Sequence, residues 1–247
     1  GETADTIEAI RSAKKKGAKV ISIVNVMGSS VMRESHKTIL QGAGPEISVL
    51  STKAYTSQVA ILLLIAHELV GKFDEGKSKL KELIRYIYYL TSKSMRDHIK
   101  ELSERLRYTQ HLYLIGRGLQ YATALEAALK IKEVSYIHAE AYAGGELKHG
   151  TIALIENGTP CIVFTSDKTE KEIMSNASEL KARGAYLIGV GPKNNELFDF
   201  YIKVREAEDL NSICQIIPMQ ILAYQLALLR GCDPDKPRNL AKSVTVK

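Results

Sequence analysis

The stretch His111-Leu112-Tyr113-Leu114-Ile115-Gly116-Arg117-Gly118 decides the fold class. Its apolar run ends in glycine, which predicts a buried strand followed by a tight turn. A helix is predicted directly after it, over residues 121–136. Strands and helices that alternate in this way predict right-handed βαβ units and a parallel sheet covered by helices on both faces. The pattern continues with strands at 160–165, 185–191 and 199–204, and with helices at 168–183 and 210–230.

A second, shorter α/β set precedes residue 74. It offers a helix over residues 3–16 and only two strands, at 18–26 and 38–43, which are too few for a stable doubly wound sheet. The sequence also begins without methionine, so we expect preceding residues to belong to this fold. The prediction is an α/β chain with a first subdomain (1–74) that is incomplete at its N-terminus, a second subdomain (75–232) and a C-terminal tail (233–247).

Composition excludes several classes of function. The three cysteines are widely spaced and form no CxxC pair, which indicates a reducing cytoplasm and gives no support for a disulfide framework or a zinc site. The net charge of +6 is interpreted as a lysine-rich surface, because no basic stripe with interleaved aromatic residues occurs. The longest apolar stretch is far shorter than a membrane span. We therefore predict no metal, no cofactor, no nucleic acid and no membrane.

The predicted sheets direct attention to segments beyond the carboxyl ends of strands, where ligands of open α/β sheets bind. Two such segments, residues 1–6 and 48–53, each precede a helix and contain hydroxyl side chains. A helix N-terminus offers free N–H groups and a positive dipole end to a phosphate. The simpler alternative is that their threonines only cap the helices. The Gly116-Arg117-Gly118 turn is a third and weaker candidate.

The helix near residues 124–137 carries the most informative pattern. Its apolar residues cover most of the circumference, so the helix is predicted to be buried. Glu126, Lys130 and Glu133 fall together in one narrow sector at i+4 and i+3 spacing. Buried charges need partners or a use. One interpretation is a polar stripe with a carboxylate that carries protons; the alternative is an ordinary surface ion pair.

The segment after this helix, residues 138–150, is dense in glycine and ionisable side chains. Such a loop seldom builds core and often builds a site. Its two histidines, His138 and His149, are available as acid–base groups near neutral pH.

Several of these motifs resemble the isomerase domain of the glucosamine-6-phosphate synthase family, which has two flavodoxin-like sugar isomerase (SIS) subdomains. The resemblance covers the whole chain and is most specific in the long helix and the tail. The segments that carry it are residues 1–6 (GETADT), 49–55 (VLSTKAY), 126–142, 145–150 (GELKHG) and 237–246 (PRNLAKSVTV).

The resemblance implies a role for particular residues. Glu133 is similar to the base that moves a proton between C1 and C2 of the sugar, and Lys130 to the lysine beside that base. Lys242 is similar to the lysine that forms a Schiff base with the open-chain ketose. His149 is similar to a histidine that assists ring opening from the neighbouring subunit. Substrate contacts are implied for Thr3, Val49, Ser51 and Ala241.

The implied activity is conversion of fructose 6-phosphate to glucosamine 6-phosphate, with ammonia from a glutaminase domain that this sequence lacks. A cytoplasmic homodimer is implied as well. Two alternatives remain open at the level of sequence: a sugar-phosphate isomerase of the same fold that never uses ammonia, and a non-catalytic SIS module that senses a sugar phosphate.

Overall fold

The computed structural model describes residues 1–245 of the 247-residue chain. Val246 and Lys247, which end the predicted tail, lie outside the described residues. The chain divides into two compact units. The first unit comprises Gly1–Phe73 together with the chain from Asp235 onward, and the second comprises Asp74–Pro234. The C-terminal tail therefore packs with the N-terminal part of the chain.

The first unit contains a parallel pair of strands flanked by helices. Strands β1 and β2 pair in register from Ile21 with Lys37 to Val24 with Leu40. Ile10, Val24 and Val31 form its small buried core. A short helix that the pattern did not predict, α2, begins where the Ser29 hydroxyl accepts a hydrogen bond from Met32 N. The elements are α1 (Ala4–Lys15), β1 (Ile21–Val24), α2 (Ser30–Glu34), β2 (Lys37–Leu40) and α3 (Lys53–Leu69).

The second unit is built on a parallel sheet with strand order β4-β3-β5-β6-β7. This is the flavodoxin-like order, in which all strands are parallel and the direction in which successive strands are added across the sheet reverses between β3 and β5. The predicted α/β class with parallel sheets is confirmed. The unit contains α4 (Phe73–Leu90), α5 (Lys93–Leu106), β3 (His111–Gly116), α6 (Leu119–Ser135), β4 (His138–Ala143), η1 (Gly144–His149), η2 (Thr151–Leu154), β5 (Pro160–Phe164), η3 (Asp167–Thr169), α7 (Glu170–Lys181), β6 (Tyr186–Gly191), β7 (Phe200–Lys203), η4 (Glu208–Leu210) and α8 (Asn211–Leu229).

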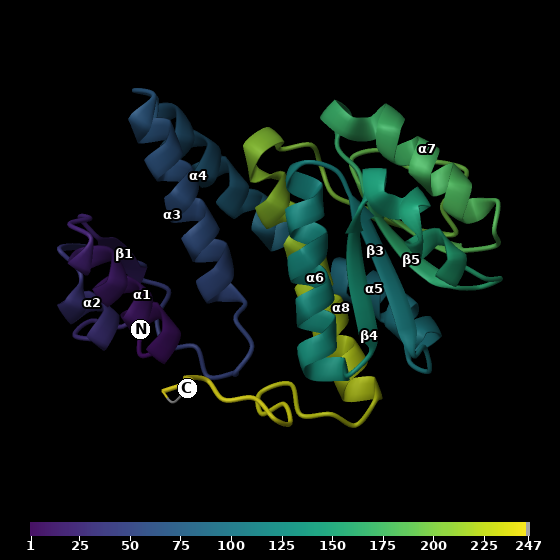
Figure 1. Ribbon diagram of the computed structural model, residues 1–247. Coiled ribbons are helices and arrows are strands. Elements are labelled where there is room, and N and C mark those ends of the chain that lie inside the picture. Colours follow the sequence, from purple (N-terminus) through teal and green to yellow (C-terminus); the bar gives the residue numbers. More distant parts are fainter. Residues whose placement is uncertain (246–247) are drawn as a thin grey trace. The chain divides into compact units, whose positions relative to one another are not determined.

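Helices cover both faces of this sheet. Helices α6 and α8 pack against each other on one face, with α5 against α8, whereas α7 covers β5 and β6 on the other (Figure 1). The core under α7 includes Ile115, Val163 and Ile173, all buried. Burying the strands from both sides explains why their sequences are apolar throughout.

The density of glycine and ionisable side chains predicts a loop over residues 138–150, but residues 138–143 form β4, which pairs with β3 along its whole length at the edge of the sheet. An edge strand tolerates polar side chains, which is why the apolar pattern is missing there.

Within the described residues, one helical stretch, Glu208–Leu229, is long and apolar enough to span a membrane by length and composition. Most of it is buried against the other helices and the sheet, as in a core helix.

Candidate active-site residues

Helix α6 places three charged residues on one side of a buried scaffold. Its core face consists of Ala124, Ala127, Ala128 and Ile131, which pack in the interior of the second unit. Small alanines allow the helix to lie close to the sheet and to α8. The helix is thereby held rigidly, and side chains that project from it have fixed positions.

Lys130 lies between two carboxylates on this helix. Its Nζ is 3.3 Å from Glu126 Oε1 and 2.8 Å from Glu133 Oε2. The lysine side chain is only 3% exposed, and those of Glu126 and Glu133 are 14% and 22% exposed. A surface ion pair, the simpler alternative, is therefore wrong, because the cation at its centre is buried.

The two carboxylates differ in their surroundings. Burial raises the pKa of Glu126, and the positive charge of Lys130 only partly offsets this effect. Glu133 is the more exposed of the two, and its Oε2 contacts Lys130 as an ion pair without a well-aligned hydrogen bond. The arrangement holds Glu133 beside a fixed positive charge, and its carboxylate can still accept a hydrogen bond or a proton from another group.

Strand β4 and the turn η1 present His149. Leu147 is buried and anchors the turn, while Lys148 pairs with Glu179 at 2.8 Å. His149 is the last residue of η1 and is exposed to solvent. The turn thus displays an imidazole at the surface, where it can reach a ligand or another molecule.

The Gly116-Arg117-Gly118 turn lies at the carboxyl end of β3, next to η1. Arg117 Nε donates a hydrogen bond to Asn176 Oδ1 at 3.1 Å. Gly144 packs against both side chains, because a Cβ at that position would lie 2.6 Å from Asn176 Oδ1. The turn is therefore part of a tight side-chain cluster, and we assign it no ligand.

The sequence did not point to a buried polar cluster at the reversal point between β3 and β5. The Ser166 hydroxyl contacts Gln120 Oε1 at 3.2 Å, and Gln215 Nε2 donates to the Thr165 carbonyl at 2.6 Å. The only signal was the pair of hydroxyl residues directly after a buried strand. Gln215 Oε1 is buried and accepts no hydrogen bond.

In the first unit, Thr3 stands at the start of α1. Its side chain makes no capping hydrogen bond to the helix, so its hydroxyl is not used as a cap. The first backbone N–H of the helix, that of Ala4, donates to the carbonyl of Val244 in the tail at 3.0 Å. The exposed hydroxyl of Thr3 therefore lies close to a tail segment that follows Lys242 by two residues.

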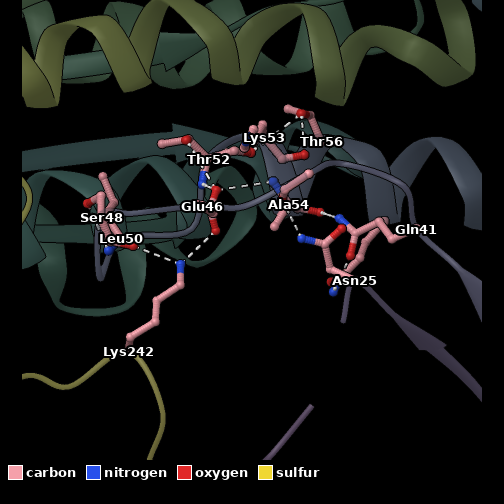
Figure 2. Close-up of polar contacts among 12 residues, drawn as sticks. Asn25, Gln41, Glu46, Ser48, Leu50, Thr52, Lys53, Ala54, Thr56 and Lys242 are labelled. Carbon is pink, nitrogen blue, oxygen red and sulfur yellow. Dashed lines mark hydrogen bonds and ion pairs between the residues drawn. The ribbon is translucent and has the colours of Figure 1, made fainter. Parts of the chain in front are cut away.

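The loop before α3 is fixed by several side chains (Figure 2). Asn25 donates to the Gly44 carbonyl at 2.8 Å and accepts from Ala43 N at 2.9 Å. Gln41 Nε2 donates to the carbonyl of Ala54 at the start of α3. These bonds explain why a glycine-rich loop has a defined path.

Val49, Ser51 and Ala241 lie on this loop and on the tail. Val49 N donates to the carbonyl of Asp235 at 3.1 Å, which ties the tail to the loop. Ser51 is half-buried next to buried Leu50, and Ala241 is exposed in the tail. The structure of the first unit thus brings Val49, Ser51 and the tail into one region.

Lys242 reaches this loop from the tail. Its Nζ is 2.8 Å from Glu46 Oε2 and donates to the Ser48 carbonyl at 2.7 Å (Figure 2). Glu46 Oε1 accepts hydrogen bonds from the backbone N–H groups of Thr52 at 2.9 Å and Ala54 at 3.2 Å. Burial favours the neutral acid, but the bonds from Lys242, Thr52 and Ala54 outweigh it and hold the pKa of Glu46 below its usual value.

Sequence reasoning missed Glu46. It is one glutamate in a loop of no special pattern, and its partner Lys242 is 196 positions away. Only the return of the tail to the first unit brings the two together.

Comparison with known proteins gives the family. The family model described as the SIS domain matches residues 1–68 and 105–230. The chain belongs to the SIS domain family. The resemblance drawn from its motifs is thereby confirmed.

The chain is similar along its full length to glutamine–fructose-6-phosphate aminotransferases (isomerizing). It is 45% identical over 253 residues to that of Pyrococcus horikoshii, a match that covers 100% of this chain and 42% of that protein. It is 44% identical to that of Bacillus licheniformis, with the same coverage of 100% and 42%. The chain therefore spans about two fifths of the length of these relatives.

Solved structures give the same picture. The C-terminal domain of glucosamine-fructose-6-phosphate aminotransferase from Francisella tularensis superposes with a TM-score of 0.85 at 36% identity, over 95% of this chain and 70% of that one. A glucosamine-6-phosphate deaminase from Thermotoga maritima superposes with a TM-score of 0.79 at 25% identity, over 99% of this chain and 72% of that one.

Proposed function

We propose that this chain carries out the sugar half of glucosamine 6-phosphate synthesis, in which fructose 6-phosphate and ammonia become glucosamine 6-phosphate. The observation that carries the proposal is the charged trio of α6, in which a lysine only 3% exposed holds Glu133. A buried ion pair is weak evidence of a stabilising role, so its presence favours a use in chemistry. The similarity to aminotransferases over the whole chain supports the choice of substrate.

Lys242 acts as the nucleophile in this proposal. Its neutral amine adds to the C2 carbonyl of the open-chain ketose, and the resulting carbinolamine takes up one proton and loses the former carbonyl oxygen as water, which leaves an iminium. Ammonia then adds to C2 and the lysine amine departs, which leaves a protonated imine of ammonia at C2 and returns the neutral amine to Lys242.

Glu133 acts as the proton carrier. Its carboxylate removes a proton from C1 to give an enaminol and returns one to C2. The C1 hydroxyl then releases its proton, so that C1 becomes an aldehyde and C2 carries the amino group. Lys130 is proposed to hold Glu133 in place through their ion pair. His149 is proposed to assist ring opening, since an exposed imidazole can both donate and accept a proton near neutral pH.

The remaining predicted residues are proposed to bind the substrate. Thr3 offers a free hydroxyl at the start of α1, where a phosphate is favoured by the helix dipole. Val49, Ser51 and Ala241 are proposed to contact the sugar, because they share a region with Lys242 in the first unit. Residues 1–74, 75–232 and 233–247 are the proposed first SIS subdomain, second SIS subdomain and active-site tail.

Other features of the whole protein are also proposals. Ammonia is proposed to come from a glutaminase domain elsewhere in the parent protein. A cytoplasmic homodimer is proposed, in which His149 serves the neighbouring subunit. A two-fold dimer is the commonest assembly of soluble homo-oligomers.

The test is thermal unfolding of this chain with fructose 6-phosphate, with unphosphorylated fructose as the control. A ligand present at about 100 times its Kd stabilises a protein by roughly 2.7 kcal/mol, which raises Tm by roughly 5–11 °C at this chain length. We expect stabilisation by the phosphorylated sugar alone, and formation of glucosamine 6-phosphate when ammonium is supplied. Equal shifts with both sugars, or no shift at millimolar ligand, would refute substrate recognition by this chain.

A further inference from the structure

We propose that Glu46 is the positioning residue of Lys242: it holds the lysine nitrogen in place, first as an ammonium and then as the protonated Schiff base. This inference rests on the proposed function, in which Lys242 is the nucleophile. Glu46 itself touches neither the sugar carbons nor the leaving water.

The first support is that each oxygen of Glu46 has a defined task. Oε1 faces the backbone N–H groups of Thr52 and Ala54, at 2.9 and 3.2 Å. Oε2 faces Lys242 Nζ at 2.8 Å. The carboxylate cannot turn away from the lysine without breaking both backbone bonds at the start of α3.

The second support is burial. The Glu46 side chain is 7% exposed, while that of Lys242 is 43% exposed. The buried carboxylate of Glu46 therefore has a fixed position, whereas the accessible side chain of Lys242 can move. Surface ion pairs with two mobile ends contribute little, whereas here one end is immobilised before the pair forms.

The third support is the attachment of the tail on both sides of Lys242. Asp235 accepts a backbone bond from Val49, and Val244 accepts one from Ala4. The lysine therefore approaches Glu46 from a segment tethered at two points. The Ser48 carbonyl adds a second acceptor for Nζ at 2.7 Å and defines its direction.

The chemistry gives this arrangement a purpose. Conversion of the lysine ammonium and a ketone into an iminium and water conserves the positive charge on nitrogen. The protonated Schiff base is the form whose C2 is electrophilic enough for ammonia to add, and a carboxylate near the nitrogen keeps it protonated. The Ser48 carbonyl is a neutral acceptor for Lys242 Nζ, and Lys53, at the nearby start of α3, is a cation. Among these groups only Glu46 carries the negative charge that favours the protonated Schiff base.

The test is reductive trapping with borohydride in the presence of fructose 6-phosphate, followed by peptide mass spectrometry. The variants are Glu46→Gln and Glu46→Asp, with Lys242→Arg as the negative control. The glutamine keeps an oxygen for the two backbone N–H groups but replaces the charged acceptor that faces Lys242 with an uncharged NH2 group. The aspartate keeps the charge but is one methylene shorter. Thermal unfolding checks that each variant is folded.

We expect the wild-type chain to trap sugar on Lys242, and both variants to trap at least tenfold less at pH 8. In Glu46→Gln the loss of trapping should be larger at high pH, where the protonated Schiff base depends most on the negative charge of Glu46. Trapping by Glu46→Gln at the wild-type yield and with the wild-type pH profile would overturn the inference.

A second measurement separates this inference from the proposed function. Competitive acetylation of lysines needs no sugar and compares Lys242 with Lys15, an exposed lysine at the end of α1. The ion pair should protect Lys242, and Glu46→Gln should raise its acetylation several-fold without changing Lys15. If the wild-type chain traps no sugar, the Schiff-base proposal fails; if acetylation of Lys242 is also unaffected by Glu46→Gln, the role of Glu46 fails separately.

Discussion

Replacing Lys130 by methionine tests the energetics of the charged trio. Methionine fills a similar apolar volume, so the change removes the charge and little of the packing. Two carboxylates, at 3.3 and 2.8 Å from Nζ, then lose their cation. Removing one partner of a buried ion pair costs roughly 3–5 kcal/mol. Since both carboxylates keep some contact with water, we expect a loss of about 3 kcal/mol in the free energy of unfolding at pH 7.5.

The loss should depend on pH with a definite sign. Burial already raises the pKa of Glu126, and removal of Lys130 raises it further. A carboxyl with a raised pKa in the folded state destabilises the fold once the pH exceeds its unfolded value of about 4.5, and the penalty grows until the folded value is passed. The variant should therefore recover by about 1 kcal/mol or more at pH 5, since one pKa unit corresponds to about 1.4 kcal/mol.

Urea unfolding at pH 7.5 and pH 5 measures both quantities. The matched control is Lys132→Met, on the same helix but at an exposed position, which should change stability by less than about 0.5 kcal/mol. A loss below about 1 kcal/mol for Lys130→Met, or an equal loss at the two pH values, would refute the argument that a buried cation holds the two carboxylates.

Two further outcomes follow from the same structure. Hydrogen bonds lower the pKa of Glu46, so the stability that this residue contributes is present above about pH 4.5 and is lost as the pH falls through the lower pKa of the folded state. Proteolytic cleavage of the tail of the wild-type chain should therefore rise in that acid range. In Glu46→Gln the cleavage should already be fast at pH 7. Gly144→Ala should cost about 1–3 kcal/mol by overpacking, because its Cβ would lie 2.6 Å from Asn176 Oδ1 and 3.2 Å from Arg117 Nε. The control Gly145→Ala, whose Cβ would approach Arg117 no closer than 3.9 Å, should be nearly neutral; equal Tm shifts for the two alanines would contradict the packing argument.

Most strands of the second sheet could be predicted because helices cover both faces of the sheet, so these strands have apolar sequences. Strand β4 could not be predicted in this way, because it is an edge strand and its sequence, HAEAYA, is not an apolar run. Helix α2 escaped because it is only five residues long and depends on the Ser29 cap. Elements with a long periodic or apolar pattern could be predicted from the sequence, whereas a five-residue helix and a polar edge strand could not.

The same distinction applies to the candidate site. Glu126, Lys130 and Glu133 are neighbours on one helix, so their grouping follows from helical periodicity. That Lys130 is buried depends on what packs around α6, which the spacing alone left open. The Glu46–Lys242 pair depends on contacts between distant parts of the chain, and no local pattern reports it.

Proton transfer by Glu133 is the central claim, and hydrogen exchange in the substrate tests it most directly. The chain is incubated with fructose 6-phosphate and ammonium in D2O, and deuterium at C1 and C2 of the sugar phosphates is followed by NMR. General base catalysis contributes roughly 10²–10⁴-fold, so we predict deuterium incorporation by the wild-type chain and at least about a hundredfold slower incorporation by Glu133→Gln, with sugar-phosphate binding retained. Incorporation by Glu133→Gln at the wild-type rate would contradict the account.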